Sequence, residues 1–102
     1  MVVMDSDTGK IVAALAISGD VDDVAFDPHR KRIYASCGDG AIAVIRQLDA
    51  DNYEFLGTVA TVKGARTSVL NPGEGRLYLA VPRPADRPEQ RNPEVWVYRA
   101  RP

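Results

Sequence analysis

Acidic and basic side chains that could bind a ligand gather in three short polar segments of this 102-residue chain, residues 18–23, 37–39 and 63–67, and we expect the long loop from Pro82 to Pro93 to lie on the same face. The first is SGDVDD, residues 18–23, where three carboxylates could offer oxygen ligands to a hard cation. Its spacing does not match a calcium loop, so we expect neither a metal nor another cofactor. The predicted ligand-binding residues in and beside the three segments are Asp20, Asp22, Asp23, Cys37, Asp39, Lys63 and Arg66.

Nucleophilic catalysis has little support in the residue types present. Cys37 is the single cysteine, so the chain by itself forms no disulfide. A catalytic cysteine needs a nearby histidine, and the only one, His29, lies at the far end of the strand expected between them. We therefore expect Cys37 to be a small, partly buried residue at a strand end, and we assign no catalytic residue.

Composition argues against two classes of partner. The formal net charge is -1, whereas nucleic acids and anionic membranes are bound by clustered lysine and arginine. The richest basic run, Arg30 to Arg32, is expected to be a solvated turn. No apolar run approaches the length of a membrane span, and the acidic N-terminus is unlike a signal peptide. As written, the sequence predicts a cytoplasmic protein.

A repeat of 44 residues organises the chain. The segment DPHRKRIY, residues 27–34, returns as NPGEGRLY, residues 71–78, with Tyr34 and Tyr78 at the same position. Fixed periods of about 40 to 50 residues, each holding several short strands, are typical of the four-stranded antiparallel blades of β-propellers. The sequence therefore predicts an all-β fold with about two blades per chain.

The strands of each blade can be read from apolar runs and turn residues. Residues 21–62 hold four predicted strands, VDDVAFDP, RIYASC, AIAVIRQL and YEFLGTVATV, and form one complete blade. Residues 65–101 hold three, with a proline-rich loop from Pro82 to Pro93 before the last. Residues 1–17 supply the third and outer strands of a preceding blade. The second blade thus lacks its outer strand.

The stretch from MDSDTGK to GAIAVI resembles the YVTN-type repeat of bacterial lactonase-like seven-bladed β-propellers, with its D-x-x-T-G-K start and its R-hydrophobic-Y strand. The resemblance covers nearly the whole chain except residues 83–93, and it is specific for fold and weak for function. It implies a periplasmic or extracellular location for a full-length parent. It also implies that ligands meet the loops at the mouth of a central channel.

Three functions remain open from the sequence. The first is a non-catalytic propeller module that assembles with copies of itself, as a trimer of six blades or a tetramer of eight, and binds partners at the channel mouth. The second is a C-terminal fragment of a larger propeller, which would need its missing blades. The third is a lactonase-type hydrolase. The repeat places Asp22 and Arg66 one period apart and predicts an ion pair between adjacent blades. The alternation of Trp96 with Val95 and Val97 on a predicted strand indicates that Trp96 packs against a neighbouring blade.

Overall fold

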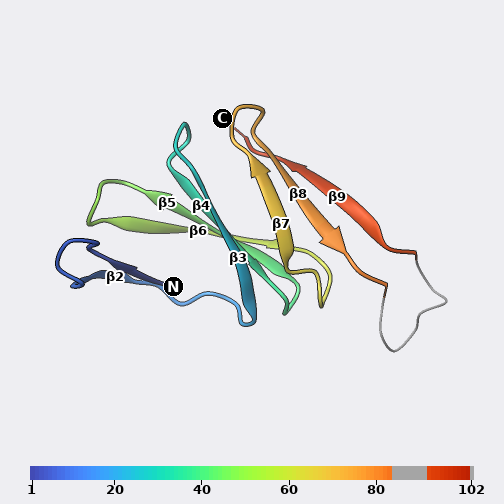
Figure 1. Ribbon diagram of the computed structural model, residues 1–102, viewed down its shortest axis with the longest axis horizontal. Coiled ribbons are helices and arrows are strands. Elements are labelled where there is room, and N and C mark those ends of the chain that lie inside the picture. The colour runs from blue at the N-terminus through green and yellow to red at the C-terminus, as the bar shows by residue number, and fades with distance from the viewer. Residues whose placement is uncertain (84–91, 102) are drawn as a thin grey trace.

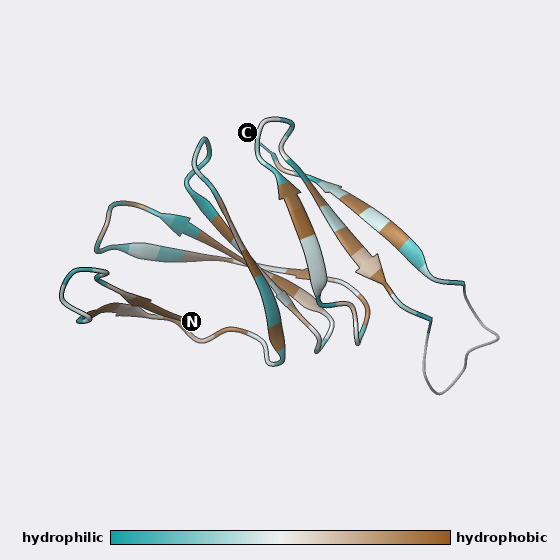
Figure 2. Ribbon diagram, in the orientation of Figure 1, coloured by the Kyte–Doolittle hydropathy of each residue, from teal (hydrophilic) through white to brown (hydrophobic). Residues whose placement is uncertain are grey.

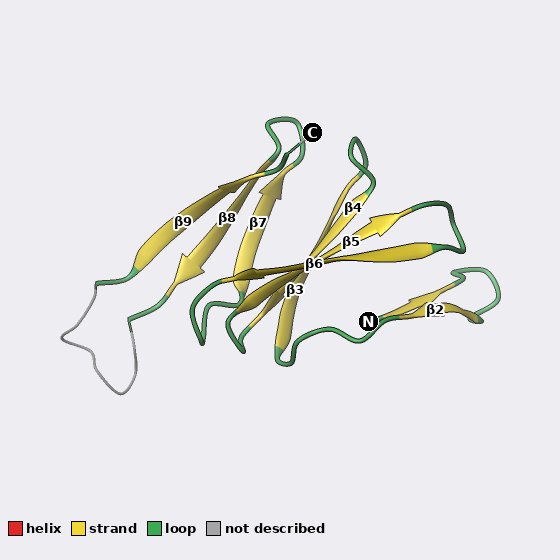
Figure 3. Cartoon of the chain, turned by 180° about the vertical axis from the view of Figure 1, so that it is seen from behind, coloured by secondary structure: helices red, strands yellow, loops and turns green. Residues whose placement is uncertain are grey.

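β-Strands and turns make up the part of the chain that the computed structural model describes, residues 1–83 and 92–101 (Figure 1). No helix occurs in these residues, as Figure 3 makes plain. The all-β prediction is confirmed. The strands are β1 (Val2–Met4), β2 (Ile11–Ala14), β3 (Val21–Asp27), β4 (Arg32–Cys37), β5 (Ala41–Gln47), β6 (Tyr53–Ala60), β7 (Thr67–Asn71), β8 (Arg76–Val81) and β9 (Glu94–Arg99).

Three antiparallel sheets follow one another along the chain. Sheet A is the hairpin β1–β2, sheet B has the order β3-β4-β5-β6, and sheet C has the order β7-β8-β9. The sheets are arranged side by side along the longest dimension of the molecule, with sheet B in the middle (Figure 1). This division into two, four and three strands is the one that the sequence pattern predicts. The proline-rich loop falls largely on residues 84–91, outside the described residues.

Polar turn residues end the strands at repeating positions. The Asp27 carboxylate accepts hydrogen bonds from the backbone N–H groups of His29 and Arg30, at 2.9 and 3.1 Å. One period later, the Asn71 side-chain oxygen accepts one from the N–H of Glu74, at 3.3 Å. Side chains of this kind hold tight turns by replacing a backbone acceptor. The repeat in the sequence is thus a repeat in turn geometry.

The two middle strands of sheet B, β4 and β5, are largely buried on both faces, and successive residues along each strand point to opposite sides. Its first face contributes Tyr34 and Ile42 to a cluster that we call the B–C core, completed by Ala65, Leu77, Leu79 and Val81. Its second face contributes Ala35, Cys37, Ala43 and Ile45, the A–B core, against which Met1, Leu15 and Ile17 pack. Sheet B therefore depends on a neighbour on each side.

Sheet C is covered on one face only. Leu77, Leu79 and Val81 point into the B–C core, and Trp96 packs against that core, as predicted. The residues that alternate with them lie on the opposite face, where Val69 is 66% exposed and Val97 is 55% exposed. Figure 2 shows the alternating apolar bands along β9. Tyr34 is buried, whereas Tyr78 is only half-buried because none of the three described sheets covers it.

Candidate functional site

The three polar segments singled out in the sequence meet at one end of sheets B and C. The backbone N–H of Gly38 donates to the Asp20 carbonyl at 2.7 Å, and the N–H of Gly64 donates to the Gly38 carbonyl at 2.7 Å. Gly38 thus links the segment before β3 to the segment before β7. We call this set of contacts the loop cluster. It brings predicted residues from all three segments together.

The ion pair in the loop cluster joins Arg66 to Asp20. Arg66 Nη1 lies 2.9 Å from Asp20 Oδ2, and both side chains are about half exposed. The prediction that Asp22 pairs with Arg66 was therefore wrong. The pairing of β3 with β4 shifts register between Val21 and Asp23, which leaves Asp22 as the extra residue of a bulge. A bulge redirects side chains, so counting along the period misplaces the carboxylates before it.

The Asp20 side chain lies against Gly38, in the loop between β4 and β5, where only glycine leaves room for it. Asp20 adopts a left-handed backbone with φ of 60°, which places its carboxylate over Gly38. A Cβ at position 38 would clash with Asp20 Oδ2, so a side chain there would force the carboxylate away. The geometry of the ion pair therefore depends on a strained aspartate and a glycine.

Two other predicted aspartates accept hydrogen bonds from the backbone. Asp39 Oδ2 accepts from the N–H of Gly19 at 3.0 Å, and Asp23 Oδ2 accepts from the N–H of Ser68 at 2.8 Å. The second contact crosses from sheet B to sheet C. Asp22 and Lys63 are exposed. The carboxylates of Asp20, Asp23 and Asp39 thus already have partners that fix the loops.

Cys37 lies at the end of β4, but its side chain points into the A–B core and is fully buried. Burial is the main cause that raises the pKa of the Cys37 thiol, and the charges of Asp39 and Asp20 add to it. A protonated, inaccessible thiol is a poor nucleophile and a poor ligand. Cys37 therefore contributes packing to this end of the sheet and does not present its sulfur to a ligand.

The chemistry available at the loop cluster is hydrogen bonding and ion pairing. The described residues contain no group of three or more His, Cys, Asp or Glu side chains arranged to hold a metal ion. A hollow of about 560 Å³ adjoins the cluster at the end of sheet C. It is lined by Gly64, Arg66, Thr67, Ala80, Val81, Pro82, Pro93, Glu94 and Val95. Arg66 is the lining residue that carries positive charge.

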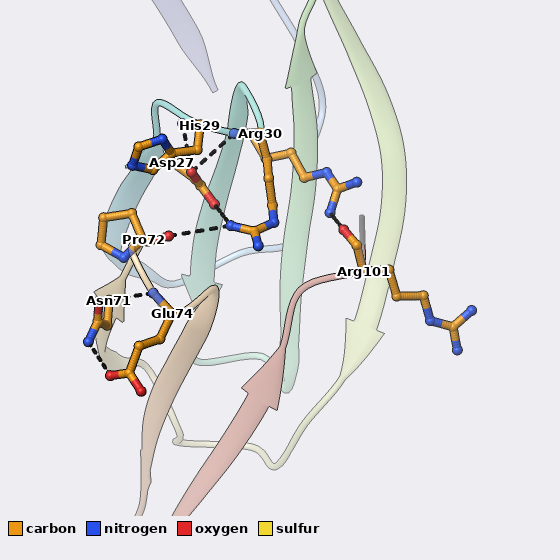
Figure 4. A network of polar contacts seen from close by, with 8 residues as sticks. Asp27, His29, Arg30, Asn71, Pro72, Glu74 and Arg101 are labelled. Carbon is orange, nitrogen blue, oxygen red and sulfur yellow. Dashed lines mark hydrogen bonds and ion pairs between the residues drawn. The ribbon is translucent and has the colours of Figure 1, made fainter.

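A second polar network lies at the turns that follow β3 and β7 (Figure 4). The Asp27 side chain is fully buried, and its Oδ2 lies 3.1 Å from Arg30 Nη1. The same Arg30 nitrogen donates to the Pro72 carbonyl at 3.4 Å, which links sheet B to sheet C. Arg32 Nη1 donates to the Arg101 carbonyl at 2.6 Å. The basic run is thus more than the solvated turn that we expected.

Opposing effects set the protonation of Asp27. Burial, the largest single cause, raises the pKa of this carboxyl, but the hydrogen bonds from Arg30 and His29 and the charge of Arg30 together outweigh it. The net result is a pKa below the ordinary value of 3.8. The sequence contains a signal for this network, namely Asp27 with Arg30 three residues later, but the contact with Pro72 depends on the placement of two turns in space.

A continuous apolar surface is the third candidate. Cross-strand pairs place Val69 opposite Tyr78, Tyr78 opposite Val97, and Ala80 opposite Val95, all on the face of sheet C that points away from sheet B. Val69, Val95 and Val97 are each more than half exposed. We call this set of five residues the outer face of sheet C. Apolar side chains grouped in this way mark an interaction surface.

No protein-family model, curated protein or solved structure matches the chain. Among the described residues, no helix is long and apolar enough to cross a membrane.

Proposed function

We propose that this chain is a non-catalytic β-propeller module, in which sheets B and C are successive blades that assemble with further copies of the chain. The observation that carries the proposal is the difference between equivalent faces. Tyr34 and Ile42 of sheet B are buried against sheet C, whereas none of the three described sheets covers Tyr78 and Val95, at the same positions of sheet C. Because the outer face of sheet C is equivalent to the first face of sheet B, the repeat indicates that a similar sheet surface covers it.

The partner surface is the second face of sheet B in another copy. Inside one chain, the first face of sheet B, which carries Tyr34 and Ile42, packs against the side of sheet C that carries Leu77, Leu79 and Val81. The equivalent residues of sheet B, one period earlier, are Ile33, Ala35 and Cys37, which belong to the A–B core or pack against it. Head-to-tail contact of this kind repeats in one direction. It closes into a ring of three or four chains when the rotation fits six or eight blades.

The loop cluster then lies at one end of the assembled sheets, where it offers a binding surface. Supporting this role are the half-exposed Asp20–Arg66 pair and the adjoining hollow lined by Arg66. A concave surface with a few polar groups is the usual form of a ligand site. The carboxylate-rich loops and Arg66 favour a polar ligand. No residue in the cluster is assigned a role in bond breaking.

The test of assembly is light scattering coupled to size exclusion at micromolar concentration. We expect a trimer or a tetramer for the unmodified chain and a monomer for Val69→Lys, which places a charge on the outer face. Ala50→Lys adds the same charge in an exposed turn and should keep the oligomer. A folded, stable monomer of the unmodified chain would refute the proposal and favour a chain that is completed only by other blades.

A further inference from the structure

The N-terminal hairpin reproduces one half of sheet B, including its irregularity. In sheet B, Val44 pairs with Gly57, and the register then shifts so that Ile45 pairs with Phe55. In sheet A, Val3 pairs with Ala13, and the same shift brings Met4 opposite Ile11. Ala13 and Gly57 are one 44-residue period apart, as are Ile11 and Phe55. Strand β2 is therefore the structural equivalent of β6.

Among the described residues, sheet C has no strand in the place of β6. Val97 in β9 pairs with Tyr78, just as Val44 in β5 pairs with Tyr34, so β9 is the equivalent of β5. Strand β5 has β6 on its other side, whereas β9 is an edge strand among the described residues. Exposed edges hold backbone groups that are free to pair with an added strand.

A groove of about 330 Å³ runs between β6 and the end of β9. Its lining includes Leu56 and Val59 from β6 and Tyr98 from β9, and most of its surface is apolar. A strand added beside β9 would therefore pair its backbone with that of β9. Every second side chain of the added strand would enter the apolar groove. This combination suits an extended peptide.

Strand β2 cannot fill this place within its own copy. Strands β2 and β9 lie at opposite ends of the molecule (Figure 1), whose longest dimension is 49 Å. We propose that β2 of one copy leaves β1 and adds to β9 of a second copy, antiparallel, in the register of β5 and β6. Ala13 then lies opposite Val97, and Ile11 lies opposite Tyr98. This inference rests on the proposed self-assembly and specifies its contact.

The exchange gives β2 a longer partner. Strand β1 has three residues, and β9 has six. Ile11, which is 64% exposed on β2, moves to the side of the groove lined by Leu56 and Tyr98. Leu15 and Ile17 remain packed on sheet B of their own copy. Strand β1 leaves its position beside sheet B, and sheet C of the second copy takes that position. The same movement places the outer face of sheet C of the second copy against the A–B core residues of the copy that supplied β2.

Paired cysteines test the register directly. A protein carrying Val97→Cys is mixed with one carrying Ala13→Cys, allowed to exchange, and oxidised under mild conditions. Residues directly opposite in neighbouring strands have the separation that a disulfide needs. The matched control replaces Ala13→Cys with Ala14→Cys, because the next residue points to the other face. All of these variants also carry Cys37→Ala, because the exchange opens the A–B core in which this thiol is buried.

A cross-linked pair that forms at least tenfold faster with Ala13→Cys than with Ala14→Cys supports the exchange. An oligomer by light scattering with equal or absent cross-linking overturns the exchange and leaves assembly through the faces intact. A monomer without cross-linking overturns both. If the cysteine variants do not fold, the probe is a synthetic peptide of residues 8–17, added to the Val69→Lys variant, whose β9 edge is open because we expect this variant to be a monomer.

Trp96 is the single tryptophan and lies opposite Ala14 in the proposed register, so its fluorescence reports on the added strand. We expect a saturable blue shift of the emission. The same peptide with Ile11→Asp should bind at least tenfold more weakly, because the charge would enter the groove. Emission that does not respond to the unmodified peptide overturns the exchange.

Discussion

Single residues at equivalent turns carry different chemistry, and Asp27 shows it most clearly. Asp27 forms a charged network with Arg30, whereas Asn71 fills the same place one period later with a neutral amide. Asp27→Asn keeps an acceptor for the turn and loses the ion pair. We expect it to lower the free energy of unfolding by about 1–2 kcal/mol near neutral pH, measured by urea denaturation at fixed protein concentration.

The loss at Asp27 should depend on pH. Because the pKa of the folded carboxyl lies below its ordinary value of 3.8, the stabilisation is fully present above that value. It disappears as the pH falls below 3.8 through the lower pKa of the folded state. The difference between the unmodified chain and Asp27→Asn should therefore shrink toward zero in acid. A difference that is constant with pH would mean that the charge contributes nothing.

Backbone strain differs between two equivalent residues in the same turns. Lys31 has a φ of 57°, and Gly75, one period later, has a φ of 67°. This left-handed region costs a residue with a side chain about 1–2 kcal/mol, whereas glycine enters it freely. Lys31→Gly should stabilise the chain by about 0.5–1 kcal/mol, once the greater freedom of glycine in the unfolded state is subtracted.

Gly75→Ala is the matched opposite of Lys31→Gly. Its new Cβ would lie 2.7 Å from Arg30 Nη2, in addition to the strain of the backbone. We expect it to destabilise the chain by about 1–2 kcal/mol in the same denaturation experiment. If both variants change stability in the same direction, the left-handed conformation is not what decides the effect.

At the scale of the element, the two faces of sheet C should respond differently to the loss of methyl groups. Leu79 is completely buried in the B–C core, so Leu79→Ala should cost about 2–5 kcal/mol. Val69 is 66% exposed on the other face, and Val69→Ala should change the stability of the dissociated chain by less than about 0.5 kcal/mol. Urea denaturation at low protein concentration compares the two. Equal losses would contradict the assignment of the faces.

Sequence patterns predicted the elements well because each strand has a local signal. Pro28 follows the end of β3, and Gly40, with a φ of 105°, completes the turn between β4 and β5. The ion pair failed because the bulge at Asp22 changes which side chain faces Arg66. The bridge from Arg30 to Pro72 was missed because it joins residues 42 positions apart. Local signals define strands, but the contacts between sheets depend on how the sheets are placed.

At the scale of the whole molecule, the outer face of sheet C should link folding to association. Any partner that binds only the folded chain raises its apparent stability, and the gain grows with the concentration of that partner. When the partner is another copy, the thermal midpoint should rise with the concentration of the chain itself. Circular dichroism melts over a hundredfold range of concentration measure this dependence directly.

The charged variant supplies the decisive comparison in these melts. Val69→Lys puts an ammonium group on the outer face, where burial in an interface would leave it unpaired at a cost of several kcal/mol. We therefore expect its midpoint to be independent of concentration and equal to that of the unmodified chain at the lowest concentration. Ala50→Lys should retain the full dependence, because it adds the same charge far from the outer face, in the turn between β5 and β6. A midpoint of the unmodified chain that stays constant across the range would mean that folding does not involve a second copy, and the outer face would then need a partner of a different sequence.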